Sequence, residues 1–334
     1  MNILFFCQYD EDYSPEFKQK AREIAKGENV IFAAEHQWTK EEYHAQLGEA
    51  DVICSFIAKK DMQYCKRLKL MLLDIAGVDG FIDSPYLPRD AVICNASGLY
   101  GNLIAEHSVA LALAICRGIP VYVQHQEKKL WKLEKPDKPV EGSTVLILGA
   151  GDIGTAIARD IRPMLGNGKI IGVRRVRREV PSAFDGMITF AELDAYLPQA
   201  DLIFCALPHT KETKGLLHAG RLRMMKDDAV LVNCGRGSLI PLDDLAAVLQ
   251  EGKLFGAALD VAEVEPLPAD HPIWDCGRLL ITPHAAGNAM TIHSPTAQRL
   301  NDLLLENLEN YLTGKPLKNV VSRETGYKEL QINT

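Results

Sequence analysis

The sequence of 334 residues lacks the marks of a membrane, secreted or metal-binding protein. No stretch reaches the roughly 18 consecutive apolar residues of a membrane-spanning helix. The mostly apolar segment 1–6 has no basic flank and is soon followed by acidic residues, which favours a first strand over a signal peptide. The eight cysteines form no Cys-x-x-Cys pair, and no cluster of His, Cys and carboxylate groups has metal-ligand spacing. We therefore expect no membrane, no metal ion, and reduced thiols in the cytoplasm.

An excess of basic residues is also missing. The 44 acidic residues outnumber the 37 basic ones, and the formal net charge is −7. Such a protein has no general attraction for phosphate backbones, so nucleic acid is not an expected partner. The chain is longer than one hydrophobic core usually allows, which predicts two domains.

Short apolar runs alternate with helical segments along both halves of the chain. This alternation is typical of an α/β protein whose mostly parallel sheets carry helices on both faces. The first series of predicted strands is Ile3–Cys7, Val30–Ala33, Val52–Ser55, Leu70–Asp74 and Val92–Cys94. The second series is Thr144–Leu148, Lys169–Val173, Asp201–Ala206, Val230–Asn233, Gly256–Val261 and Arg278–Thr282.

Two long helices accompany these strands. The segment Asn102–Val123 is almost wholly apolar, and Pro120 is expected to break or kink it. A helix that is apolar on nearly every side is a buried one, so we expect it between domains or against a second copy of the chain in a homodimer. The segment Thr291–Leu312 has apolar residues spaced for one buried helical face.

A Gly-x-Gly-x-x-Gly motif follows an apolar strand and opens a helix. Gly149 permits the tight turn, Gly151 lets the backbone approach a pyrophosphate, and Gly154 lets helix and strand pack closely. Asp152 and Ile153 lie at the helix start, where unpaired N–H groups and the positive end of the helix dipole favour phosphates. These five residues are predicted to bind a dinucleotide; an ordinary glycine-rich turn is the alternative.

The end of the next strand bears on which dinucleotide is bound. An acidic residue that holds the ribose hydroxyls of NAD is expected about 20 residues beyond the motif. Arg174 stands there instead, followed by Arg175, Arg177 and Arg178. Arginine suits the additional 2′-phosphate of NADP by charge and by forked hydrogen bonds, so NADP(H) is favoured and NAD(H) is possible. A solvated basic patch is the alternative interpretation.

The order of further segments resembles that of the D-isomer-specific 2-hydroxyacid dehydrogenase family, and the resemblance covers nearly the whole chain. It implies a Rossmann-type dinucleotide-binding domain, residues 101–287, and a discontinuous flavodoxin-like α/β substrate domain, residues 1–100 and 288–334. It also implies a homodimer and an active-site cleft that closes around the substrate. The segments that carry it are Ala76–Asp79, Asn95–Gly98, Ala105–His107, the glycine motif, Leu207–Gly215, Val232–Gly237, Leu259–Pro266 and Thr282–His284.

The reaction implied is the reduction of a small 2-oxo acid, such as glyoxylate or hydroxypyruvate, to the D-2-hydroxy acid. Arg236 and His284 both follow predicted strands, at the edge of a sheet where α/β proteins bind ligands. The guanidinium can hold the substrate carboxylate and keto oxygen, and a protonated imidazole can act as general acid. The resemblance implies that Glu265 is the partner of His284, and a nearby carboxylate favours the imidazolium form.

The resemblance assigns weaker roles to several more residues. Backbone groups at Ala76, Gly77 and Val78 would bind the substrate carboxylate. Cofactor-binding residues, besides Arg236 and His284, would be Leu207, Pro208, Thr213, Cys234, Gly235 and Asp260. Cys234 is expected to be a small lining residue and not a nucleophile, because this reaction needs no covalent step.

Three other functions stay open. The chain ends soon after its last predicted helix, which argues against a phosphoglycerate dehydrogenase-like enzyme with a C-terminal regulatory domain. Some relatives of the family are nucleotide-sensing co-repressors, and an intact set of Arg236, Glu265 and His284 permits catalysis without proving it. An amino-acid dehydrogenase on a similar fold is the third alternative.

Overall fold

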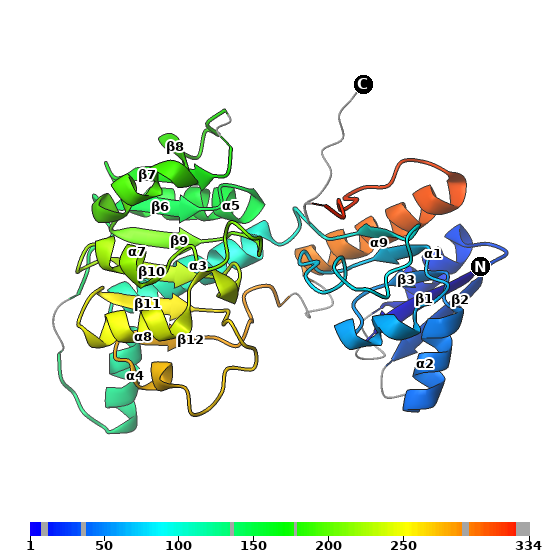
Figure 1. The fold of residues 1–334 in the computed structure, drawn as a ribbon, viewed down its shortest axis with the longest axis horizontal. Helices are drawn as coiled ribbons and strands as arrows, with labels where there is room; N and C mark the ends of the chain where they lie inside the picture. The colour runs from blue at the N-terminus through cyan, green and yellow to red at the C-terminus, as the bar shows by residue number, and fades with distance from the viewer. Residues whose placement is uncertain (8–12, 35–37, 134–136, 177–178, 289–293, 325–334) are drawn as a thin grey trace. The chain divides into compact units, whose positions relative to one another are not determined.

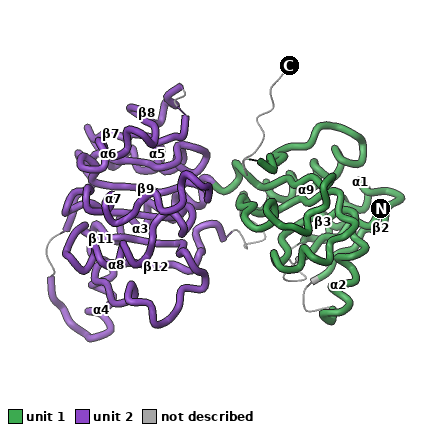
Figure 2. Tube along the Cα trace, viewed as in Figure 1, with its two compact units in different colours: residues 1–100, 289–334 green, residues 101–288 purple. Residues whose placement is uncertain are grey.

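The computed structural model describes residues 1–7, 13–34, 38–133, 137–176, 179–288 and 294–324. The chain divides into two compact units (Figure 2). Unit 1 comprises Met1–Tyr100 and Ala289–Thr334, and unit 2 comprises Gly101–Asn288. Unit 1 is therefore discontinuous in sequence. Each unit contains one sheet whose strands all run parallel.

Unit 1 has the strand order β2-β1-β3-β4-β5, which is the flavodoxin-like order. Helices α1 and α9 cover one face of this sheet and α2 covers the other (Figure 1). The elements are β1 (Asn2–Cys7), α1 (Pro15–Ile24), β2 (Asn29–Ala34), α2 (Lys40–Glu49), β3 (Val52–Cys54), β4 (Leu70–Leu72), β5 (Val92–Cys94) and α9 (Pro295–Thr313).

Alternating strand residues of unit 1 divide its core into two clusters. Leu4 and Phe6 pack with residues of α2, whereas Ile3 and Phe5 pack with residues of α1 and α9. This is the period of two that a strand imposes on its side chains, and here both sets are apolar because both faces are covered.

Unit 2 has the order β12-β11-β10-β9-β6-β7-β8, which is a Rossmann sheet with one additional strand at its edge. The two-sheet α/β fold predicted from the sequence is therefore confirmed. The elements are α3 (Gly101–Cys116), α4 (Ile119–Glu127), β6 (Thr144–Leu148), α5 (Asp152–Ile161), β7 (Lys169–Arg174), β8 (Gly186–Thr189), α6 (Leu193–Tyr196), β9 (Leu202–Cys205), α7 (Ala219–Met224), β10 (Val230–Asn233), α8 (Leu242–Gln250), β11 (Gly256–Leu259) and β12 (Leu279–Ile281).

The sheet of unit 2 is also buried on both faces. Val145 and Ile147 pack into a cluster with residues of α3 and α5, and Leu146 and Leu148 pack into a second cluster with residues of α6, α7 and α8. A fully covered parallel sheet holds its strand ends rigidly, which is what a site built on those ends requires.

The structure corrects the expected helix Asn102–Val123. It is two helices, and the chain turns at Gly118, which adopts a left-handed φ of 64°. Pro120 lies in the first turn of α4, where its missing N–H group costs no hydrogen bond, so it does not cause the break. Most of the buried residues of α3 pack within unit 2, against α5 and the sheet, so its apolar character is explained inside one unit.

The predicted helix Thr291–Leu312 begins later than expected. Helix α9 starts at Pro295, and the side chain of Ser294 caps it by accepting a hydrogen bond from the Ala297 N–H. Residues 291–293 lie outside the described part of the chain.

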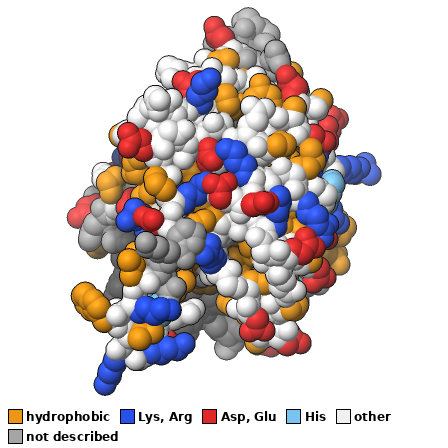
Figure 3. All heavy atoms as spheres, turned by 90° about the vertical axis from the view of Figure 1, so that its left-hand side faces the viewer, with side chains coloured by type: hydrophobic (Ala, Val, Ile, Leu, Met, Phe, Trp, Pro, Cys, Tyr) orange, Lys and Arg blue, Asp and Glu red, His pale blue; other side chains and the backbone are white. Residues whose placement is uncertain are grey.

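Two features of the structure concern the partners predicted from the sequence: the distribution of charge on the surface and the length and polarity of the helices. On the face in Figure 3, acidic, basic and hydrophobic side chains are interspersed. Among the described residues, no single helix is long and apolar enough to cross a membrane, although α3 and α4, bent by 69°, pass that test as a pair.

Candidate active site

Five consecutive strands of unit 2 deliver the predicted site residues to one edge of its sheet. Because the strands are parallel, their carboxyl ends share that edge. Along it, the segments that follow β6, β9, β10, β11 and β12 carry, respectively, Gly149, Leu207 with Pro208, Arg236, Glu265 and His284. The strand order reverses between β6 and β9, which is the crevice where such sheets bind dinucleotides.

The glycine motif forms the turn between β6 and α5. Gly149 has a φ of 103°, and a Cβ atom there would lie 2.5 Å from the carbonyl oxygen of Ala206. Gly151 is the N-cap of α5, and a Cβ atom on it would meet nothing within 4 Å. Asp152 and Ile153 form the first turn of this helix. The open space over Gly151 and the helix N–H groups fit a pyrophosphate.

The basic residues after β7 lie beside this turn. Arg174 is the last residue of β7, and its Nε donates a 2.9 Å hydrogen bond to the carbonyl oxygen of Ala150 inside the glycine motif. Arg175 follows it and is exposed. Arg177 and Arg178 lie outside the described residues. Arg174 therefore brings positive charge directly to the glycine turn.

Arg236 lies in a backbone turn that is built by Asn233. The fully buried side chain of Asn233 accepts a hydrogen bond from the Gly235 N–H at 3.1 Å and donates one to the Arg236 carbonyl oxygen at 3.1 Å. The half-buried guanidinium of Arg236 donates from Nη1 to the Gly235 carbonyl oxygen at 3.0 Å. Sequence reasoning missed the role of Asn233, although its position at the strand end is typical of a residue that shapes a turn.

His284 and Glu265 are in direct contact. Nδ1 of His284 donates a 2.7 Å hydrogen bond to Oε2 of Glu265, and the other carboxylate oxygen accepts from the Ala262 N–H at 2.9 Å. The carboxylate thus fixes the ring and leaves Nε2 as the nitrogen for a ligand. His284 itself has a left-handed φ of 55°, which is unusual for a residue with a side chain.

Comparisons with known proteins identify the family. A family model described as the NAD-binding domain of D-isomer specific 2-hydroxyacid dehydrogenases matches residues 109–286, more than half of the chain. The chain belongs to this family. A glyoxylate reductase from Thermofilum pendens is 30% identical over 314 residues, which are 89% of this chain and 89% of that protein.

Two solved structures extend the comparison to the whole fold. A D-isomer specific 2-hydroxyacid dehydrogenase family protein from Aeromonas salmonicida has a TM-score of 0.82 and 30% identity, covering 96% of this chain and 99% of its own. An NADPH-dependent glyoxylate/hydroxypyruvate reductase from Sinorhizobium meliloti, in complex with NADP and sulfate, has a TM-score of 0.76 and 26% identity, covering 98% and 99%.

Three further residues that the sequence predicts to bind the cofactor are largely buried. Asp260 is 2% exposed, and its carboxylate accepts hydrogen bonds from the N–H groups of Ala285 and Ala286 at 2.8 and 3.0 Å. The hydroxyl of Thr213 donates to the Pro208 carbonyl oxygen at 2.7 Å, so this side chain organises the loop after β9. The third residue, Cys234, is also buried.

Burial raises the pKa of the Cys234 thiol to about 12, the Asp260 carboxylate acts in the same direction, and a hydrogen bond with Ser108 opposes both. The thiol therefore stays protonated near neutral pH. A protonated, buried thiol is a poor nucleophile, which agrees with the expected lining role. No group of three or more His, Cys, Asp or Glu side chains that could hold a metal ion is found in the described part of the chain.

The residues assigned to the substrate carboxylate lie in unit 1. Ala76, Gly77 and Val78 follow β4 at the carboxyl end of that sheet. The Asn95 side chain donates a 2.7 Å hydrogen bond to the Ala76 carbonyl oxygen, and the Val78 carbonyl accepts from the Phe81 N–H at 3.0 Å. This loop is therefore held by the next strand end of the same unit.

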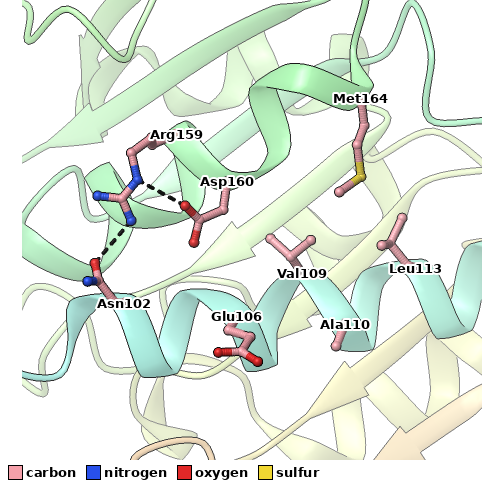
Figure 4. Close-up of a pocket in the computed structure, with 8 residues that line it drawn as sticks. All are labelled: Asn102, Glu106, Val109, Ala110, Leu113, Arg159, Asp160 and Met164. Carbon is pink, nitrogen blue, oxygen red and sulfur yellow. Dashed lines mark hydrogen bonds and ion pairs between the residues drawn. The ribbon is translucent and has the colours of Figure 1, made fainter. Parts of the chain in front are cut away.

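A groove between α3 and α5 contains none of the predicted site residues (Figure 4). Its floor is apolar, from Val109, Ala110, Leu113 and Met164. Arg159 lies at one end and hydrogen-bonds Asn102 and Asp160 at 3.0 Å each, and Glu106 projects from α3 beside them. The side chains that line the groove include no histidine, and Arg159 is already engaged by Asp160 and Asn102, so we do not assign the chemistry to it.

Proposed function

We propose that the protein reduces a small 2-oxo acid, with glyoxylate and hydroxypyruvate as the preferred candidates, to the D-2-hydroxy acid by hydride transfer from NADPH. The observation that carries the proposal is the 2.7 Å contact between His284 and Glu265 at the sheet edge that also carries Arg236 and the glycine turn. A general acid, an anion-binding group and a dinucleotide cradle are the three parts that this reduction needs.

The proposed proton donor is His284. Because Nδ1 already donates to Glu265, a second ring proton on Nε2 makes the ring an imidazolium that can donate to the substrate carbonyl oxygen. Glu265 compensates that positive charge and restricts ring rotation. In the reverse direction the neutral ring accepts the hydroxyl proton, so His284 serves as general acid and base.

The proposed substrate anchor is Arg236. Its fork can bind a carboxylate through two hydrogen bonds and can polarise the adjacent keto oxygen. The turn that Asn233 builds limits the positions this side chain can reach. We assign unit 1 as the substrate domain and Ala76, Gly77 and Val78 as additional binding groups for the acid.

Unit 2 is the proposed cofactor domain. A bound nicotinamide would supply the hydride, while the glycine motif and the start of α5 would hold the pyrophosphate. Arg174 and Arg175 support a preference for NADP(H), with NAD(H) as the second possibility. The Sinorhizobium meliloti reductase, which is similar over nearly the whole chain, is described as NADPH-dependent and supports the same preference.

We also propose that two copies associate. The segment 119–133 exposes five large apolar side chains, those of Ile119, Val123, Leu130, Trp131 and Leu133, and Trp131 is fully exposed. A second copy of the chain is the proposed occupant, because exposed apolar residues concentrated in one segment are typical of an interface. Substitution of both Trp131 and Leu133 by serine should lower the mass measured by sedimentation, whereas Tyr86→Ser should not. An unchanged mass for the double variant would contradict this interface.

The compartment is proposed from the thiols. The seven cysteines whose side chains are described are free and buried, which supports a reducing compartment such as the cytoplasm.

The proposed reaction is tested with the purified chain and NADPH or NADH. Glyoxylate, hydroxypyruvate, pyruvate and phenylpyruvate are added in turn, and loss of reduced-nicotinamide absorbance is followed. We expect turnover with at least one acid, faster with NADPH. Cofactor binding without turnover would favour the co-repressor alternative, and turnover that requires ammonia would favour an amino-acid dehydrogenase. We do not favour a phosphoglycerate dehydrogenase, because the Thermofilum pendens and Sinorhizobium meliloti proteins, which match over most of their lengths, are described as a glyoxylate reductase and a glyoxylate/hydroxypyruvate reductase.

A further inference from the structure

A buried carboxylate organises the turn that carries His284. Asp260 follows β11 and accepts hydrogen bonds from three groups of the segment after β12. These are the Thr282 hydroxyl at 2.6 Å, the Ala285 N–H at 2.8 Å and the Ala286 N–H at 3.0 Å. A carboxylate that is 2% exposed needs such donors, because an unpaired buried charge is costly. The segments on both sides of position 284 are therefore tied to one anion.

The backbone of His284 is part of the same arrangement. Its N–H group donates to the carbonyl oxygens of Asp260 at 2.8 Å and Thr282 at 3.0 Å. The left-handed φ of 55° at a non-glycine residue persists only where the surroundings hold it. The hydrogen bonds to Asp260 supply that restraint.

Helix α3 adds a side chain to this network from a distant part of the sequence. Nε2 of His107 lies 3.1 Å from the Thr282 hydroxyl oxygen and 3.5 Å from Oδ1 of Asp260. The single hydroxyl proton of Thr282 is donated to Asp260, so the hydroxyl can only accept from His107. This chemistry fixes the tautomer of His107, whose Nε2 must carry a proton.

We propose that His107 is a positioning residue for His284. Acting through Thr282 and Asp260, it holds the His284 turn so that the imidazole stays aligned with Glu265. The inference rests on the proposed function, since it assigns His107 a part in delivering the proton donor. This positioning role differs from a packing role, because it depends on the Nε2–H group of His107 and not on the volume of the ring.

The test compares two substitutions of similar size. His107→Leu keeps volume but removes the donor, and His107→Gln places an amide N–H where Nε2 lies. We expect His107→Leu to lower kcat roughly 10- to 100-fold, because small misplacements of a catalytic group have effects of this order. We expect His107→Gln to retain most of the wild-type kcat, and NADPH affinity to change little in either variant. Glu106→Leu, a neighbour on α3 that lines the groove in Figure 4, is the control and should behave as wild type.

A second readout does not depend on turnover. The hydrogen-bonded Nδ1 proton of His284 should give a downfield NMR signal, assigned by its loss in His284→Asn. This signal should disappear or broaden in His107→Leu and persist in His107→Gln. If wild type reduces no oxo acid, the proposed function fails while this signal still tests the positioning role. Equal signals and equal kcat in wild type and His107→Leu would overturn the inference.

Thr282 provides an independent pair in case the His107 variants fold poorly. Thr282→Ser keeps the hydroxyl and should retain the His284 signal, whereas Thr282→Val is similar in shape, removes the hydroxyl and should lose it. Residues of one network are not additive, so His107→Leu combined with Thr282→Val should lower kcat no further than the worse single variant. Full additivity of the two effects would contradict a shared network.

Discussion

Gly154 packs so tightly on Gly149 that a Cβ atom at position 154 would lie 2.1 Å from the Gly149 carbonyl oxygen. Both partners are backbone, so neither can move without distorting the start of α5. Gly154→Ala should therefore destabilise unit 2 by about 1–3 kcal/mol, the usual range for overpacking. The measurement is the thermal unfolding midpoint without cofactor.

Gly151→Ala is the matched control, because its Cβ atom would meet nothing within 4 Å. It should leave the midpoint unchanged and weaken NADPH binding, since the added methyl group would occupy space proposed for the pyrophosphate. Unaltered NADPH affinity in this variant would count against the proposed cradle.

The contact between His284 and Glu265 predicts different effects of two substitutions. His284→Ala removes the proton donor and should lower kcat about 10²–10⁴-fold, the range for general acid–base catalysis. Glu265→Gln keeps the shape but loses the negative charge that favours the imidazolium, so its effect should be smaller and in the same direction. Steady-state kinetics with the best oxo acid checks both, and a wild-type rate in His284→Ala would exclude it as the acid.

Arg236 should determine substrate affinity through geometry as well as charge. Arg236→Lys keeps the charge but loses the fork, and Arg236→Ala loses both. Each charge-assisted hydrogen bond contributes about 1.5–3 kcal/mol, so affinity for the oxo acid should fall in the order wild type, lysine, alanine. An Arg236→Ala variant with wild-type KM would contradict its role as the anchor.

Arg174 should influence the choice of cofactor. Arg174→Asp removes a positive charge beside the glycine turn and places a carboxylate where ribose hydroxyls of NAD are held in many Rossmann domains. We expect the ratio of kcat/KM for NADPH to that for NADH to fall. Because Arg174 also donates to the Ala150 carbonyl oxygen, the exposed Arg175→Ser is a useful second variant. If neither substitution changes the ratio of kcat/KM for NADPH to that for NADH, Arg174 and Arg175 are surface charges without a part in the choice of cofactor.

Asp201 predicts a pH-dependent contribution to stability. Burial acts to raise its pKa, but hydrogen bonds from Lys226 at 2.8 Å and from the Thr144 N–H at 2.9 Å, with Lys138 nearby, outweigh burial and lower the pKa below the ordinary 3.8. The stabilisation is therefore fully present above that ordinary value and is lost as pH falls through the lower folded value.

Asp201→Asn should thus lower the unfolding midpoint at pH 7, and the difference from wild type should shrink once the pH falls below about 4. Thermal unfolding of both proteins across that interval provides the measurement. A difference that stays constant down to strongly acidic pH would show that the ion pairs are not its source.

The sequence predicted the repeating parts of this fold better than the parts that appear once. Both sheets are built from buried apolar runs, so all eleven predicted strands lie within a few residues of β1 to β7 and β9 to β12; the short strand β8 (Gly186–Thr189) gave no comparable signal. The sequence suggests Pro120 as the cause of the helix break, because a proline is an obvious helix breaker, whereas the left-handed conformation of Gly118 is recognised only from its φ.

The candidate site also contains local features that the sequence predicts and long-range contacts that it does not predict. The turns that carry the glycine motif and Arg236 could be predicted, because local sequence determines a turn after a strand. The contact of His107 with Thr282 joins residues that are 175 positions apart, and it depends on how α3 packs on β12. No local pattern encodes such a distance, so histidine on an apolar helix gave no sign of its partner.

The backbone at His284 also limits how this protein can be improved. Glycine adopts a φ of 55° freely, whereas a side chain there costs on the order of 1 kcal/mol. Selection of variants for stability alone would therefore tend to replace His284, which is the residue proposed to donate the proton. Libraries of this chain that are selected for thermostability should keep histidine at position 284. Otherwise they will enrich stable variants that have lost catalytic turnover.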